Sequence, residues 1–115
     1  MGARISVVIP AHNEQRVIAR NLALLHEGVE PGALEVVVVC NGCTDDTAAA
    51  ARAVVPDARV LELSNPSKAE AVRAGNRVAT VFPRVHLDAD VQLSGSDLLR
   101  LVRPIQEEGI CSRSE

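Results

Sequence analysis

Two acidic residues separated by one position could bind a metal ion in this chain of 115 residues. Asp88 and Asp90 follow the short stretch Arg-Val-His-Leu at 84–87, which predicts a strand. Their carboxylate oxygens are the hard ligands that magnesium and manganese prefer. Such a cation keeps open positions for substrate phosphates, and it would neutralise a diphosphate and help it to leave. A solvated acidic turn has the same pattern, and we favour the metal because a strand is expected just before it.

Two cysteines offer a second kind of chemistry. Cys40 and Cys43 bracket Asn41 and Gly42 after four valines, with the C-x-x-C spacing of redox pairs and half zinc sites. A structural zinc ion needs about four ligands, and Cys111 and three histidines do not complete such a pattern. A thioredoxin-like pair opens a helix in a different order of elements. We therefore interpret both thiols as small structural residues, with Cys40 ending the strand and Cys43 in the loop, and keep a redox role as a distant alternative.

The elements that must position these residues alternate between strands and helices. Apolar and β-branched runs predict strands at 5–10, 34–40, 60–63 and 84–87. Apolar residues at helical spacing predict helices at 13–27, 45–54 and 67–78, and from residue 96 on. The order βαβαβαβα indicates the α/β class, a Rossmann-like parallel sheet with helices on both faces. We expect one domain over residues 1–115, with a loose tail at 110–115.

Polar residues near the expected helix ends predict how the helices begin and stop. Asn13 and Thr44 are expected as N-caps of the first two helices. Ser67 and Glu70 match a capping box at the start of the third. Pro104 should kink or end the last helix, since proline lacks an N–H and clashes with the preceding turn.

Composition and missing motifs exclude several classes of function. A net charge of −3, with one Phe and no Trp or Tyr, argues against a nucleic-acid partner. Neither G-x-G-x-x-G nor G-x-x-x-x-G-K-[ST] occurs, which argues against dinucleotide dehydrogenases and P-loop NTPases. Three cysteines make no disulfide framework, and no secretory signal or membrane span is recognisable, so we expect the cytoplasm. Polar residues follow all four expected strands, which indicates a polar-ligand site at the carboxyl ends of the strands.

Three blocks of the sequence resemble one known family. The inverting family 2 glycosyltransferases, which have a GT-A fold, have a first strand and helix similar to ISVVIPAHNEQRVIARNL. Their second strand and its acidic loop are similar to VVVVCNGCTDDTAAAA, and their Asp-x-Asp segment is similar to VHLDADVQLS. The resemblance covers residues 5 to 105 and implies the N-terminal, nucleotide-sugar-binding half of that fold.

The resemblance implies a nucleobase site in the loops after the first two strands. Pro10, Ala11 and His12 should lie against the base, with the His12 ring stacking on it. Glu14 fits the family's acidic position at the start of the first helix. Asn41 matches an aspartate that contacts the base, and its amide can donate as well as accept a hydrogen bond. We expect a UDP-sugar, with a GDP-sugar as the second choice.

The resemblance also implies where the diphosphate binds. Asp88 should approach the ribose, and Asp88 and Asp90 should hold the manganese or magnesium ion that bridges the diphosphate. Lys68 lies in the segment that often supplies a basic group near the site. A surface cation in the first turn of a helix would look the same.

The implied activity is transfer of a sugar from a nucleotide-diphosphate donor to a hydroxyl acceptor, with inversion. The family uses a carboxylate as general base, and Glu107 and Glu108 follow the Asp-x-Asp segment too closely to serve. Two other functions stay open: a non-catalytic nucleotide-binding module or subunit, and a nucleotidyltransferase. Without the family's second half, we expect exposed apolar surface near the fourth strand and last helix. Such surface promotes a dimer or higher oligomer.

Overall fold

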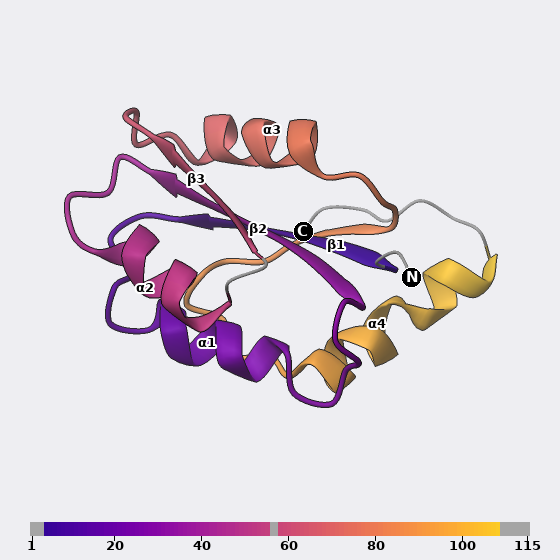
Figure 1. The fold of residues 1–115 in the computed structure, drawn as a ribbon. Helices are drawn as coiled ribbons and strands as arrows, with labels where there is room; N and C mark the ends of the chain where they lie inside the picture. The colour runs from indigo at the N-terminus through magenta and orange to yellow at the C-terminus, as the bar shows by residue number, and fades with distance from the viewer. Residues whose placement is uncertain (1–3, 56–57, 109–115) are drawn as a thin grey trace.

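The computed structural model describes residues 4–55 and 58–108 and contains a parallel four-stranded sheet covered by helices (Figure 1). The elements in chain order are β1 Ile5–Ala11, α1 Ile18–Leu25, β2 Leu34–Asn41, α2 Thr47–Val54, β3 Arg59–Leu63, α3 Lys68–Val78, β4 Arg84–His86 and α4 Gly95–Glu108. This alternation confirms the α/β class expected from the sequence.

The strands lie in the order β3-β2-β1-β4, and every neighbouring pair is parallel. The chain therefore runs outward from β1 to β3 and then returns across the sheet to β4. Helices α1, α2 and α4 cover one face, and α3, which belongs to the return crossover, covers the other (Figure 1). Because the chain leaves β1 toward one side and β4 lies on the other, ligands are expected at the carboxyl ends of these two strands.

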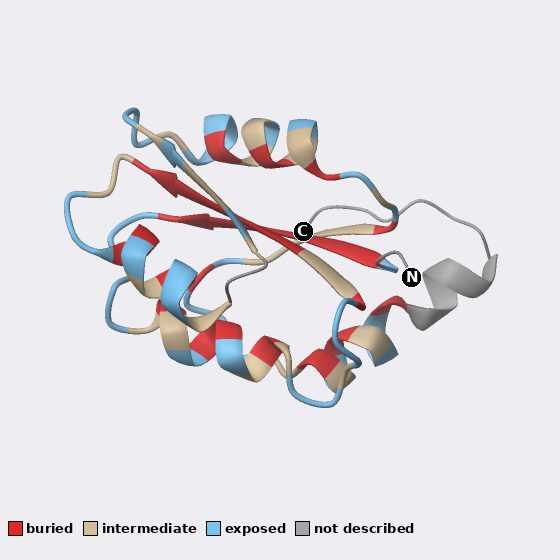
Figure 2. Cartoon of the chain, viewed as in Figure 1, coloured by how far each residue is buried: buried red, intermediate tan, exposed pale blue. Residues whose placement is uncertain are grey.

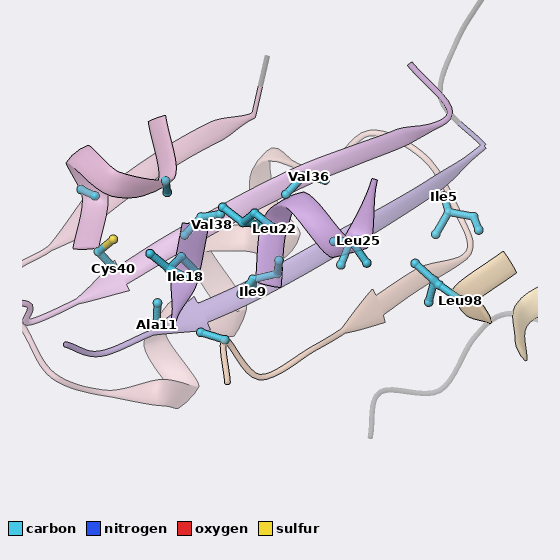
Figure 3. Close-up of a cluster of buried hydrophobic side chains, with 14 of the residues drawn as sticks. Ile5, Ile9, Ala11, Ile18, Leu22, Leu25, Val36, Val38, Cys40 and Leu98 are labelled. Atoms are coloured by element: carbon cyan, nitrogen blue, oxygen red, sulfur yellow. The ribbon is translucent and has the colours of Figure 1, made fainter. Parts of the chain in front are cut away.

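Most of the core lies between the sheet and the face covered by α1, α2 and α4. The close-up in Figure 3 shows Ile18 and Leu22 of α1 over the strands, and Leu98 of α4 near Ile5. A smaller cluster lies beneath α3, where Val37 and Val39 meet Ala71. Alternate valines of β2 thus face opposite layers, which agrees with the expectation of a strand covered on both faces.

Figure 2 shows that β1 and much of β2 are buried, whereas exposed residues lie on the outward faces of the helices. Phe82, Val91 and Leu101 are the large apolar side chains that stay exposed among the described residues. They lie beside β4 or on α4, where exposed apolar surface was expected. Oligomer formation through this surface stays a prediction. The tail at 110–115 lies outside the described residues, as does Cys111.

Two expected helix starts are wrong. The first helix begins at Ile18, because Asn13 adopts a left-handed φ of 53° and its Oδ1 accepts from the Thr44 N–H at 2.8 Å. The second begins at Thr47, whose N–H donates to Asp45 Oδ1 at 3.0 Å. A contact between two loops thus replaces the first expected N-cap, and a bond within the loop before α2 replaces the second.

Two other expected helix boundaries have different outcomes, since one is confirmed and one is wrong. Ser67 is the N-cap of α3, and its Oγ accepts from the Glu70 N–H at 3.2 Å, as the capping box predicts. Helix α4 does not end at Pro104 but continues to Glu108. None of the helices within the described residues has the length and apolar character needed to cross a membrane.

Candidate functional site

A cleft of about 260 Å³ opens at the carboxyl edge of the sheet, between the loops after β1, β2 and β4 and the start of α3. Its lining comprises Pro10, His12, Glu14, Asn41, Lys68, Asp88, Ala89 and Asp90. The structure therefore brings together every site residue expected from the sequence except Ala11. The Ala11 side chain is buried in the core beneath α1 (Figure 3).

Asn41 is the last residue of β2 and is 5% exposed. Its Oδ1 meets no hydrogen-bond donor within the part of the chain that the structure describes. Leaving a buried acceptor unpaired costs about 1–3 kcal/mol, so such an atom calls for an explanation. Since Asn41 lines the cleft, a ligand N–H or O–H that enters the cleft is the simplest partner for this oxygen.

His12 lies at the rim of the cleft and is held by the backbone of Asn41. Its Nδ1 is 2.7 Å from the Asn41 carbonyl oxygen. Because a carbonyl oxygen can accept but not donate, Nδ1 must carry the proton in this contact. The exposed ring therefore presents Nε2 away from this bond. The loops after β1 and β2 are thereby joined at the point where the cleft begins.

A second set of contacts joins the same two loops. Glu14 N–H donates to Thr47 Oγ1 at 2.9 Å, and Asn13 N–H approaches Cys43 Sγ at 3.3 Å. Cys43 in turn contacts the Ala11 carbonyl oxygen at 3.5 Å. Cys43 thus serves as a packing and hydrogen-bonding residue between loops, as interpreted from the sequence.

Cys40 has the properties of a core residue. Its thiol is buried, and burial together with the neighbouring Cys43 raises the pKa of Cys40 to about 12. A thiol needs its thiolate form to act as a nucleophile, and such a pKa keeps it protonated at neutral pH. This observation argues against the redox function considered from the C-x-x-C spacing.

The acidic side of the cleft contains Asp88 and Asp90 in the turn after β4, both exposed. Lys68 Nζ lies 2.6 Å from Asp88 Oδ1, and both side chains are more than half exposed. An ion pair so exposed contributes little to stability. The pKa of Glu14 is raised by burial and then by the negative charges of Asp90 and Asp45. The cleft therefore has a surplus of carboxylates.

The donor set fits an open magnesium or manganese site. Among the described residues no group of three or more His, Cys, Asp or Glu could hold a metal ion by itself. Asp88 and Asp90 supply hard oxygen donors, and Mg²⁺ is typically held by one or two carboxylates, with waters and substrate phosphates completing its shell. A cation there would compete with Lys68 for Asp88.

One residue of this region was missed from the sequence. Asn21 of α1 is buried, and its Nδ2 donates to the Ala89 carbonyl oxygen, between the two aspartates, at 2.8 Å. Its signal in the sequence is a polar residue on the apolar face that Ile18 and Leu22 define. Its hydrogen-bond partner, Ala89, lies 68 residues away, and no pattern in the sequence indicated this contact.

A larger hollow of about 610 Å³ lies toward the amino ends of β2 and β3. Much of its lining is apolar, including Val29, Val36 and Val54. The carboxylate of Glu35 at this hollow is already bonded by Ser6 and Thr80. The smaller cleft is the better candidate site, because it combines an unpaired buried acceptor with several carboxylates.

Comparison with known families gives one match over most of the chain. A family model described as glycosyl transferase family 2 matches residues 6–112. Uncharacterized glycosyltransferases of Mycobacterium tuberculosis and Mycobacterium bovis are 32% identical over 106 residues, which is 92% of this chain and 45% of theirs. The chain thus spans less than half the length of these relatives.

Solved structures are also similar to this chain over most of its length. Glucosyl-3-phosphoglycerate synthase from M. tuberculosis, in complex with Mn²⁺, UDP and glucosyl-3-phosphoglycerate, has a TM-score of 0.73 and 29% identity. The match covers 90% of this chain and 40% of that one. A mannosyltransferase from Pyrobaculum calidifontis, in complex with GDP-Man and Mn²⁺, has a TM-score of 0.78 and 29% identity, covering 91% and 33%.

Proposed function

The chain belongs to glycosyl transferase family 2, and we propose that its cleft binds the nucleotide diphosphate of a sugar donor. One observation carries the proposal: Asn41, whose side-chain oxygen is buried and unpaired among the described residues, lines the same cleft as two exposed carboxylates, at the carboxyl edge of a parallel sheet. The unpaired oxygen suits a nucleobase, and the two carboxylates suit the cation bound to a diphosphate. Mn²⁺ with UDP or GDP-Man in two similar structures supports this assignment.

Asn41 is the proposed base-reading residue, with Pro10, Ala11, His12 and Glu14 forming the surrounding loop. An asparagine amide offers one acceptor and one donor. Uracil presents an N–H beside a carbonyl oxygen, which matches that pair. Guanine presents the same pair at its N1–H and O6, so the Asn41 amide suits either base. UDP is the first choice and GDP the second, as the resemblance to the family implies.

Asp88 and Asp90 are the proposed residues for a divalent cation, manganese or magnesium. When bound, such a cation neutralises the diphosphate and makes it a better leaving group. Lys68 would then leave Asp88, and its Nζ would bind a phosphate oxygen as a point charge. The ion pair at 2.6 Å thus holds Lys68 at the site before the nucleotide arrives.

The proposed reaction is transfer of the sugar to a hydroxyl acceptor with inversion at the anomeric carbon. A hydroxyl attacking in line needs a general base within hydrogen-bond reach. No residue lining the cleft is assigned that role. Activity, acceptor and the cytoplasmic location expected from composition are proposals for the whole protein, since the chain spans 45% of its curated relatives.

Calorimetric titration with UDP and GDP, with and without manganese, tests the proposal. We expect manganese-dependent UDP binding that is lost in Asp90→Asn and retained in Asp97→Asn, an equally conservative change at an exposed position on α4. Equal binding by wild type and Asp90→Asn would contradict the metal assignment. Nucleotide binding without turnover would support the non-catalytic module. Pyrophosphate release from a nucleoside triphosphate and a sugar phosphate would support a nucleotidyltransferase.

A further inference from the structure

Asn21 is a polar residue on a helix face that is otherwise apolar. Its neighbours on that face, Ile18, Leu22 and Leu25, are each 1% exposed, and Asn21 itself is 6% exposed. Burying an amide is unfavourable unless it finds a hydrogen-bond partner. The Asn21 Nδ2 donates to the Ala89 carbonyl oxygen at 2.8 Å. This buried amide is thus committed to one backbone atom in the Asp88–Asp90 turn.

The turn that receives this bond is fixed at both of its ends by the backbone. Leu87 N–H donates to the Val8 carbonyl oxygen at 3.0 Å, which extends the pairing of β4 with β1 by one residue. Val91 N–H donates to the Asp88 carbonyl oxygen at 3.1 Å. Asn21 adds a side-chain anchor between these points, and it comes from a helix that is distant in sequence.

Ala89 shows what this anchor does to its neighbours. Its methyl group is buried in the core, at 4% exposure, while Asp88 and Asp90 are exposed in the cleft. Holding the carbonyl and methyl of Ala89 inward leaves the two flanking carboxylates facing outward. A turn without this anchor would let both carboxylates sample other directions.

We propose that Asn21 is a positioning residue that fixes the backbone between Asp88 and Asp90 and so sets the affinity for a divalent cation with nucleotide. The cation part rests on the proposed function, whereas the anchoring of the turn does not. A residue with no role beyond core stability would leave the turn and the cation affinity unchanged when replaced. The experiment therefore measures both.

The test variant is Asn21→Leu, which removes the donor and places an apolar side chain with the same number of non-hydrogen atoms in an apolar layer. Ser6→Ala is the matched control. Ser6 is fully buried, and its Oγ lies 2.6 Å from Glu35 Oε1 and 2.9 Å from the carbonyl oxygen of Val81, which precedes β4. Asn21→Ala serves as a second variant if the leucine prevents folding, because it removes the donor without adding volume.

The first readout needs no ligand. Hydrogen exchange of the Val91 amide, which closes the turn onto Asp88, should become at least roughly tenfold faster in Asn21→Leu and stay unchanged in Ser6→Ala, since only the former loosens this turn. Unchanged exchange at Val91 in a folded Asn21→Leu protein would overturn the proposal.

The second readout is binding. Loss of a residue that orients metal ligands typically lowers metal affinity about 10–100-fold, and we expect a loss of that size for UDP with manganese in Asn21→Leu. The affinity for uridine, measured from the chemical shift of the Asn41 amide, should not change. An equal loss in Ser6→Ala would show a general structural effect and refute the positioning role. If the wild type bound no UDP with manganese, the proposed function would fail, and Val91 exchange would still decide the anchoring.

Discussion

Replacing Asn41 by leucine should make the ligand-free protein more stable and the nucleotide complex weaker. In the free protein the Asn41 Oδ1 is buried without a donor among the described residues. Leucine has the same number of side-chain non-hydrogen atoms as asparagine and has no polar atom to leave unpaired. The change therefore removes an unfavourable group from the folded state, and it also removes the proposed acceptor for the base.

The magnitude follows from the cost of an unpaired buried acceptor, about 1–3 kcal/mol. We expect the free energy of unfolding to rise by this amount, and Tm to rise by roughly 4 °C per kcal/mol in a domain of this size. In the complex, the base N–H would be left without its partner, at a similar cost. Because each 1.4 kcal/mol is tenfold in affinity, UDP should bind about 5- to 150-fold more weakly.

Thermal unfolding of the free protein tests the expected rise in stability. Calorimetric titration with UDP and manganese tests the expected loss of affinity. Asn65→Leu is the control, because Asn65 is exposed and does not line the cleft. We expect neither quantity to change much in the control. If Asn41→Leu proves less stable than wild type, or binds UDP equally well, the reasoning from the unpaired oxygen is wrong.

Three further predictions concern packing, the ion pair and pH. Gly75→Ala should lower Tm, because the new Cβ would clash with Val8 Cγ1. Such overpacking costs about 1–3 kcal/mol, which exceeds the roughly 1 kcal/mol gained in helix propensity. A higher Tm in the double variant Gly75→Ala, Val8→Ala than in Gly75→Ala would support this clash. Lys68→Met should change stability by less than about 1 kcal/mol, since the pair with Asp88 is exposed, yet weaken UDP binding in the same titration. Burial raises the pKa of Glu35, but hydrogen bonds from Ser6 and Thr80 outweigh it and lower the pKa below the ordinary 4.5. Its stabilisation is then present above pH 4.5 and lost as pH falls through the lowered pKa, so thermal unfolding should separate wild type from Glu35→Gln at pH 7 but not at strongly acidic pH.

Strands and core could be predicted because their signals are local. The four valines of β2 predicted a strand covered on both faces, and Val36 and Val38 indeed face one layer while Val37 and Val39 face the other. The capping box at Ser67 also depends on a few adjacent residues. Local chemistry decides such features, so one sequence contains the information.

Features that depend on contacts between distant loops could not be predicted. Asn13 was expected as an N-cap, but it bonds the Thr44 N–H instead. The pair between Lys68 and Asp88 requires β4 to lie beside β1, a placement that the alternation of elements leaves undetermined. Resemblance to the family located the candidate site residues, whereas Asn21 emerged from its contact with Ala89.

The return of the chain from β3 to β4 has a consequence for how the protein folds. Val8 pairs with His86, so this contact closes a very long loop, and pairings of such separation form slowly. Lys68, Asp88 and Asp90 all lie on the returning segment, whereas Asn41 ends β2 and His12 directly follows β1, two strands that come earlier in the chain. During synthesis the N-terminal elements emerge first. The acidic side of the site is therefore completed only when β4 has paired with β1, and the proposed nucleotide binding would report completed folding.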